Sequence, residues 1–140
     1  MSKLISMSEA VSIGLHGMVL LAKQGGKGSI NVQDIASATQ SSRHHVAKIM
    51  QRLAKEGFLL SQRGPTGGFI LNKKPSAITL LDIWEAIEGK LVINSCPLDK
   101  DKKICSFGNC IMDTIALRIS GQFKEYLQNT TLASFLKNAD

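Results

Sequence analysis

The sequence has no long apolar run and no segment typical of protein export. No apolar stretch reaches the roughly 18 residues that a membrane-spanning helix needs. The N-terminal stretch contains a single early lysine and an apolar segment interrupted by Glu9, and no small-residue cleavage site follows it. A signal peptide is therefore not expected. We expect a cytoplasmic protein with no membrane contact.

The sequence also lacks the motifs of an enzyme. It shows no Ser/His/Asp order and no pair of carboxylates in the pattern of a catalytic cleft. The GGKG stretch at residues 25–28 lacks the strand–loop–helix context of a phosphate-binding loop. Hydrophobic residues make up 44% of the 140 residues, which is enough for a core. We therefore expect one compact domain, or a small domain with an appended segment, that is not an enzyme.

Positive charge is concentrated in the first half of the chain. Residues 1–74 hold ten Lys and Arg against three Asp and Glu, a net charge of +7. Residues 75–140 hold seven against eight, a net charge of −1. A basic half suggests a polyanionic partner, with nucleic acid the first candidate, although a basic surface can also simply be solvated.

Apolar residues recur at helical spacing in the first 57 residues. The first expected helix starts with a capping box of Ser6 and Glu9 and ends at the glycines of GGKG. A shorter helix capped by Asn31 follows, then a turn near Gln40 and a longer helix over residues 41–57. The expected buried positions of these helices are Val11, Leu15, Met18, Ala22, Val32, Ile35, Ala36, Val46, Ile49, Met50 and Leu53.

A β-hairpin and two further helices are expected after residue 57. Apolar runs at 58–60 and 69–71 flank RGPTGG, whose glycines and proline favour a hairpin tip. A helix capped by Thr79 and closed by Gly89 follows, with Leu80, Ile83, Trp84 and Ile87 expected to face inward. These elements predict a mainly α fold with a small β-hairpin wing, a winged helix-turn-helix.

The last long helix is expected over residues 111–129, about five turns, with a short closing helix after it. Its apolar stripe can hardly be buried within so small a chain, so pairing with a second copy is favoured over folding back onto the first helix. We therefore predict a homodimer held by a long C-terminal dimerisation helix.

The winged helix-turn-helix order predicts binding to double-stranded DNA. The N-terminal end of the second helix of such a unit reaches base edges in the major groove, and the wing can enter the minor groove. A homodimer would read a palindromic operator with half-sites about 34 Å apart. The predicted contact residues are Ser41, Ser42, Arg43, His44, His45 and Lys48 on the helix, and Arg63 and Thr66 on the wing.

All three cysteines of the chain lie within fifteen residues, in a segment rich in lysine and aspartate. Cys96, Cys105 and Cys110 have the spacing C-x₈-C-x₄-C, which fits neither a zinc knuckle nor a C-x-x-C redox motif. An odd number of clustered cysteines is also a poor disulfide framework. Three thiolates can hold an iron–sulfur cluster, with zinc, another metal, thiol redox chemistry or no role as the alternatives.

The sequence resembles the family of bacterial winged-helix regulators that includes IscR, NsrR and RirA. The resemblance rests on RGPTGGFIL, on ITLLDIWEAIEGK, on the cysteine triplet and on the long helix after it. It implies a homodimeric transcription regulator that acts as a repressor and whose cysteines hold a [2Fe–2S] or sometimes a [4Fe–4S] cluster, with one [2Fe–2S] cluster per subunit as the expectation. It also implies that Ser42, His44, His45 and Lys48 read bases and that Arg63 enters the minor groove.

The fourth cluster ligand departs from the best-known members. Asp113 stands where IscR-like proteins place a histidine, and Ser12 stands where NsrR-like proteins offer an acidic residue. His16 stands one turn later, where some relatives supply a histidine ligand. The resemblance therefore implies His16 of the partner subunit as the first candidate and Asp113 as the second.

These observations divide the chain into three functional parts. Residues 1–89 form the expected DNA-binding domain, residues 90–110 the cluster-binding loop, and residues 111–140 the dimerisation helix and tail. The expected signal is redox state, nitric oxide or iron–sulfur supply. The alternatives are a zinc- or thiol-based regulator, or a protein-interaction adaptor, in either case without a cluster.

Overall fold

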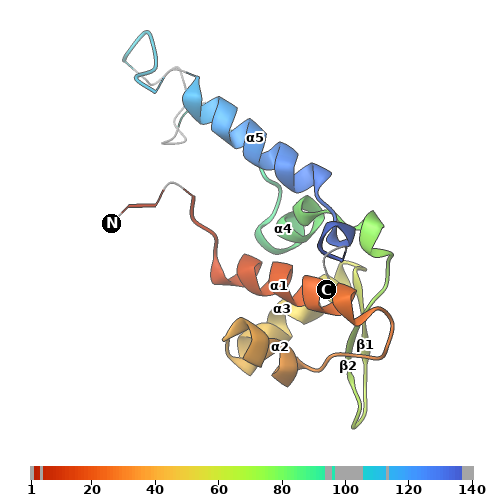
Figure 1. The fold of residues 1–140 in the computed structure, drawn as a ribbon. Coiled ribbons are helices and arrows are strands. Elements are labelled where there is room, and N and C mark those ends of the chain that lie inside the picture. Colours follow the sequence, from red (N-terminus) through yellow and green to blue (C-terminus); the bar gives the residue numbers. More distant parts are fainter. Residues whose placement is uncertain (1, 4, 94–95, 97–105, 113, 137–140) are drawn as a thin grey trace.

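The computed structural model describes residues 2–3, 5–93, 96, 106–112 and 114–136 of the chain. It confirms the predicted winged helix-turn-helix followed by a long helix (Figure 1). None of the helices in these ranges has the length and apolar character of a bilayer-spanning segment. The elements are α1 (Glu9–Gln24), α2 (Val32–Thr39), α3 (Arg43–Lys55), β1 (Leu59–Gln62), β2 (Gly68–Leu71), η1 (Pro75–Ala77), α4 (Leu80–Glu88), α5 (Ile115–Asn129) and η2 (Leu132–Phe135).

The core forms where α1 packs against α2, α3 and α4. Two glycines on the buried face of α1 allow the neighbouring helices to come close. A Cβ at Gly14 would lie 2.2 Å from Cδ1 of Ile87 in α4, and a Cβ at Gly17 would lie 3.1 Å from Sδ of Met50 in α3. The predicted apolar positions that are buried in these four helices are Val11, Met18, Ala22, Ile35, Ala36, Val46, Ile49, Met50, Leu53, Leu80, Ile83 and Ile87.

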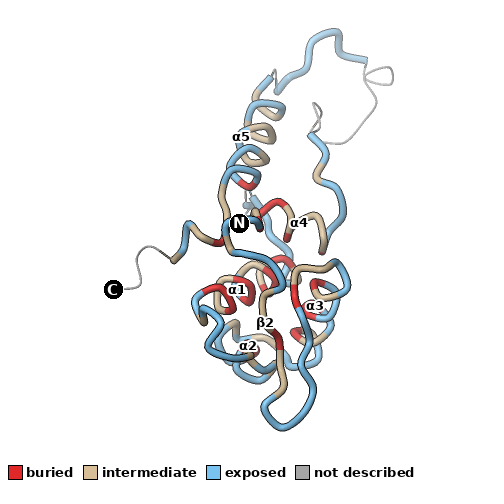
Figure 2. The backbone as a smooth tube through the Cα atoms, turned by 90° about the vertical axis from the view of Figure 1, so that its right-hand side faces the viewer, coloured by how far each residue is buried: buried red, intermediate tan, exposed pale blue. Residues whose placement is uncertain are grey.

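The wing is an antiparallel hairpin in which Leu59 pairs with Leu71 and Gln62 with Gly68. Ile30 joins the hairpin through an isolated antiparallel bridge to Phe69, with a backbone hydrogen bond in each direction. This bridge connects the segment before α2 to the base of the wing. Figure 2 shows the hairpin tip as an exposed loop that projects beyond the helices.

α5 is attached through α4 and projects away from the end of the molecule that carries the wing tip (Figure 1). Trp84 of α4 is half-buried and meets Phe123 of α5 edge to face, with ring centroids 5.3 Å apart. The Leu80 amide donates to the carbonyl of Thr130 at 2.9 Å. Leu127 is the buried residue of α5, and the other residues of this helix are half-buried or exposed.

The start of α1 corrects the predicted capping box of Ser6 and Glu9. The N-cap is Ser8, whose hydroxyl accepts a hydrogen bond from the Val11 amide at 3.2 Å. The same hydroxyl donates to the carboxylate of Glu88 in α4. This contact joins residues far apart in the chain, so local sequence patterns could not distinguish the two serines.

The last elements also differ from the prediction. α5 begins at Ile115 rather than at residue 111 and has 15 residues, about four turns instead of five. Met112, expected at the start of its apolar stripe, is 50% exposed and its neighbour Ile111 is 83% exposed, so no burial favours extending the helix to include them. The short closing helix is the single 3₁₀ turn η2.

We predict that Gly68→Ala destabilises the protein by about 1–3 kcal/mol, because a Cβ at this position would lie 2.3 Å from the carbonyl oxygen of Ile30. Thermal or urea unfolding followed by circular dichroism at fixed protein concentration measures this loss. Gly108→Ala is the control, since a Cβ there meets nothing within 4 Å. Equal stability of the two variants would contradict the close approach between the wing and Ile30.

Candidate nucleic-acid interface and cysteine segment

The turn between α2 and α3 presents the N-terminal end of α3 to solvent. Gln40 ends α2 in the left-handed region, with φ of 54°, and the Ser41 amide donates to the carbonyl of Ala36 at 3.0 Å. Ser42 is the N-cap of α3, and its hydroxyl accepts from the His45 amide at 3.1 Å. The two helices therefore meet in a short hydrogen-bonded turn, which is the geometry of a helix-turn-helix.

α3 is basic along its exposed surface. Its sequence contains four Lys and Arg residues and no acidic residue. Ser42, Arg43, His44 and Lys48 are exposed, whereas Ser41 and His45 are half-buried. The free amides at the helix N-terminus and these cations together favour an anionic ligand such as DNA phosphate.

His45 is held toward α1 rather than standing free. Its Nδ1 lies 3.6 Å from Oε1 of Glu9, a contact that becomes an ion pair when the imidazole is protonated. Glu9, expected in a capping box, instead faces the recognition helix. Sequence reasoning missed this contact because nothing in the local pattern joins the start of α1 to α3.

The wing tip is a tight turn over residues 64–67, closed by the Gly67 amide donating to the Gly64 carbonyl at 2.9 Å. Pro65 occupies the second position of this turn, which its fixed φ suits. Arg63, directly before the turn, and Thr66, its third residue, are both exposed. The Ser29 hydroxyl donates to the Thr66 carbonyl at 2.7 Å and so holds the tip to the segment before α2.

The cysteine segment is described at its two ends. Cys96 is half-buried and Cys110 is exposed, while Cys105 and Asp113 lie outside the described residues. The described residues contain no group of three or more His, Cys, Asp or Glu placed to hold a metal ion. In Figure 1 residues 106–112 lie at the far end of α5, well away from α1.

His16 lies on the exposed side of α1 with one ring nitrogen engaged. Nδ1 is 2.7 Å from the carbonyl of Ser12, and because a carbonyl can only accept, Nδ1 carries the proton and donates. In the neutral ring, Nε2 then has a free lone pair. A histidine fixed in this way through one nitrogen is the usual arrangement of a metal-ligating imidazole.

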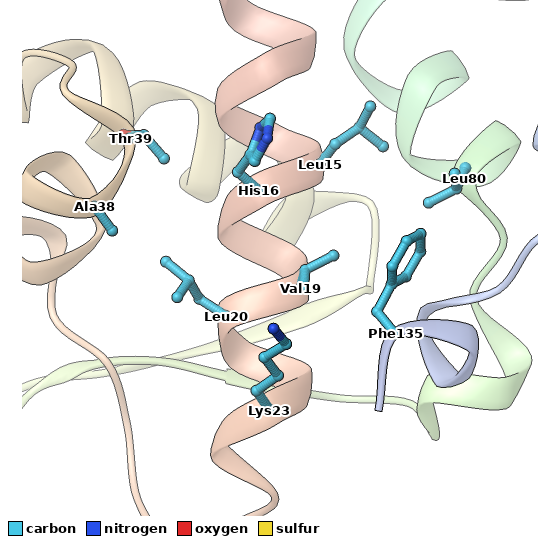
Figure 3. A pocket seen from close by; sticks show the side chains of 9 residues that line it. All are labelled: Leu15, His16, Val19, Leu20, Lys23, Ala38, Thr39, Leu80 and Phe135. Atoms are coloured by element: carbon cyan, nitrogen blue, oxygen red, sulfur yellow. The ribbon is translucent and has the colours of Figure 1, made fainter. Parts of the chain in front are cut away.

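His16 also lines a largely apolar groove of about 450 Å³ along α1 (Figure 3). Lys23 places an ammonium group at the same surface. The close-up shows α2 on one side of α1, with α4 and the C-terminal turn on the other. The remaining lining residues are Leu15, Val19, Leu20, Ala38, Thr39, Leu80 and Phe135.

The helix-turn-helix, the hairpin wing and the basic α3 define a winged-helix protein of the DNA-binding class. The chain belongs to the Rrf2 family, whose model, described as an iron-dependent transcriptional regulator, matches residues 7–138. This confirms the predicted resemblance. The protein is thus a transcriptional regulator, and its relatives are regulators rather than enzymes.

Two curated relatives match most of the chain. The HTH-type transcriptional regulator IscR of Yersinia pseudotuberculosis is 30% identical over 124 residues, covering 88% of this chain and 74% of the relative. The HTH-type transcriptional regulator CymR of Bacillus subtilis is 31% identical over 127 residues, covering 91% and 86%.

Solved structures of a CymR protein and an IscR protein share the fold of this chain. CymR, the global cysteine regulator of B. subtilis, gives a TM-score of 0.78 at 28% identity, covering 98% of this chain and 100% of the other. IscR of T. potens gives a TM-score of 0.76 at 26% identity, covering 98% and 90%.

We predict that Ser42→Ala lowers the free energy of unfolding by about 1 kcal/mol, because the His45 amide loses its acceptor. Ser42→Asp keeps an acceptor at the N-cap and should retain stability close to wild type. Urea unfolding of the two variants measures the difference. An equal loss of stability in Ser42→Ala and Ser42→Asp would show that the Ser42 hydroxyl does not act as the cap.

Proposed function

We propose that the protein is a homodimeric repressor that binds a palindromic operator and whose affinity depends on an iron–sulfur cluster. One observation carries the proposal. The same Rrf2-family chain contains a basic recognition helix and a segment bounded by Cys96 and Cys110. Redox state, nitric oxide or iron–sulfur supply would be the signal. The predicted location is the cytoplasm.

DNA contact would use the exposed end of α3 and the wing tip. Ser42, Arg43, His44 and Lys48 are exposed at the recognition helix, so they can approach base edges and phosphates. Arg63 stands beside the turn of the wing, where a guanidinium can enter a minor groove. Ser41, His45 and Thr66 complete the proposed contact set, with His45 also facing Glu9.

We predict that Lys48→Ala and Arg63→Ala each weaken operator binding by about tenfold, because each removes a cation from the proposed interface. Lys48→Ala should also reduce the slope of log affinity against log salt by about one. Fluorescence anisotropy with an operator duplex over a salt series measures both quantities. Arg118→Ala, an exposed cation on α5, is the matched control and should bind like wild type.

That experiment also separates the proposal from a protein-interaction adaptor. Neutralising phosphates releases counterions, so a DNA-binding protein must show a steep salt dependence. An adaptor would show none. Salt-independent binding, or equal loss from Arg118→Ala and Lys48→Ala, would contradict the proposed DNA surface.

Dimer formation is supported by the apolar side chains that α5 and the preceding segment leave exposed. Phe107 is 64% exposed, Leu117 44% and Tyr126 58%. Ile111 and Met112 are exposed as well, so several apolar side chains of α5 and the preceding segment are not covered within one subunit. A second copy that pairs along α5 would bury part of these side chains and bring two recognition helices into one assembly.

The donor set of the chain fits an iron–sulfur cluster. Cys96, Cys105 and Cys110 would supply three thiolates, and His16 of the partner subunit would supply Nε2, which the Ser12 carbonyl leaves free. The separation of residues 106–112 from α1 supports a histidine from the other subunit. Asp113 is the second candidate. When bound, a cluster of the [2Fe–2S] type, one per subunit, supplies reversible one-electron chemistry.

A thiol-based regulator without a cluster is the second candidate function. The relatives include the global cysteine regulator CymR of B. subtilis and an oxidised form of CymR from Staphylococcus aureus. Exposed Cys110 is accessible to small oxidants. Such a protein would change DNA affinity with thiol oxidation but would contain no iron or sulfide.

We predict that protein purified without oxygen absorbs in the visible region and contains iron and acid-labile sulfide. Cys96→Ser, Cys105→Ser and Cys110→Ser should each abolish this absorption, since each removes a thiolate. His16→Ala should shift the absorption bands and speed cluster loss. Anaerobic absorption spectra and native mass spectra measure these changes.

His44→Ala is the control for His16→Ala, because it removes another exposed imidazole, on the recognition helix. It should leave the spectrum unchanged. Colourless wild-type protein whose operator affinity still responds to thiol oxidation would favour the thiol-based regulator. An unchanged spectrum in His16→Ala would remove His16 from the ligand set.

A further inference from the structure

The last turn of α4 joins three different elements through three neighbouring residues. Glu85 Oε2 accepts from the Leu91 amide at 2.7 Å, at the start of the cysteine segment. The carbonyl of Ala86 accepts from Nε of Arg52, on the recognition helix, at 2.8 Å. The carboxylate of Glu88 accepts from the hydroxyl of Ser8, the N-cap of α1.

These acidic residues stand where a helix disfavours them. The C-terminal end of a helix carries partial negative charge, and carboxylates there are destabilising. The last turn of α4 nevertheless holds Glu85 and Glu88 and has no basic residue of its own. Each carboxylate makes a specific bond to another element, which accounts for its presence at this end.

Arg52 supplies the positive charge that α4 lacks. The carbonyl of Ala86 is one of the last four of the helix, which have no amide partner within it. The guanidinium of Arg52 satisfies this carbonyl with a charge-assisted bond from the last turn of α3. This bond joins the end of α4 to α3, the helix that carries Lys48.

The cysteine segment is anchored at the same point. Leu91 is half-buried and packs against the core, whereas Val92 and Ile93 are 65% and 40% exposed. The Glu85–Leu91 bond is thus the last described attachment before Cys96, five residues farther along. This bond therefore joins the start of the cysteine segment to α4.

We propose that the last turn of α4 couples the cysteine segment to the recognition helix, with Glu85 and Arg52 as positioning residues. The inference rests on the proposed function, in which operator affinity depends on the state of the cysteines. Glu85 transmits displacement of the segment to α4, and Arg52 transmits displacement of α4 to α3. Neither residue needs to touch the cluster or DNA bases for this role.

The test compares operator affinity of cluster-loaded protein with that of cluster-free protein, by anaerobic fluorescence anisotropy. In wild type the two affinities differ by a fixed ratio. Glu85→Ala and Arg52→Met should each bring this ratio about tenfold closer to one, a typical size for a single coupling. Visible absorption should stay as in wild type, because the thiols are retained.

Conservative variants separate coupling from stability. Glu85→Gln keeps an oxygen that can accept from the Leu91 amide and should preserve most of the ratio. Arg52→Lys keeps the charge but loses Nε, so its ratio should collapse as in Arg52→Met, and it replaces that variant if Arg52→Met does not fold. Comparing Glu85→Gln with Glu85→Ala tests the Glu85–Leu91 bond independently of the Arg52 variants.

Two controls match the charge changes. Lys55→Met removes an exposed cation one turn after Arg52 and should weaken both forms equally, leaving the ratio unchanged. Glu125→Ala removes an exposed carboxylate on α5 and should leave both affinities unchanged. Hydrogen–deuterium exchange should show faster exchange of the Leu91 amide in Glu85→Ala with or without the cluster.

The outcomes distinguish the two proposals. If wild type binds equally well with and without the cluster, the proposed regulation is wrong and the coupling role is overturned with it. If wild type responds to the cluster and Glu85→Ala, Arg52→Met and Arg52→Lys keep the full ratio, regulation stands and the coupling role of α4 is overturned. If Lys55→Met reduces the affinity ratio as much as Arg52→Met does, the coupling role of α4 is also contradicted.

Discussion

The arrangement of the molecule depends on the close packing of α4 against α1. Gly14 favours this contact, since a Cβ there would lie 2.2 Å from Cδ1 of Ile87 and that side chain would have to move. α1 also packs against α2 and α3, so the contact fixes α4 on the DNA-reading unit. α5 is then attached to α4 through Trp84 and Phe123. One helix crossing thus places the wing and the long helix at opposite ends.

This arrangement separates the recognition helix and the wing from residues 106–112 (Figure 1). The recognition helix and the wing are held by side-chain hydrogen bonds, such as those between Ser42 and His45 and between Ser29 and Thr66. The cysteine segment follows α4 directly in the chain, and its described residues 106–110 precede α5. Within one subunit, the contacts of α4 with α1 and α3 are therefore one route from the thiols to the recognition helix.

The residues of the wing motif RGPTGG have different roles. Gly67 and Gly68 are required by backbone packing, because a Cβ at either would lie within about 2.5 Å of a carbonyl oxygen. Pro65 shapes the turn. Arg63 and Thr66 are exposed, so packing does not require either side chain. The glycines therefore serve the fold, while the exposed positions are available for contact with a partner.

Much of this protein could be predicted from the sequence because its signals are local. Helical periodicity, the caps at Asn31 and Thr79 and the hairpin glycines gave the winged helix and its core, since each depends on residues a few positions apart. Only the tertiary structure showed the features that depend on long-range contacts. These are Ser8 rather than Ser6 as the N-cap, Glu9 facing His45, and the bonds at the end of α4. Side chains that meet only after folding leave no periodic pattern, so only the packed chain reveals them.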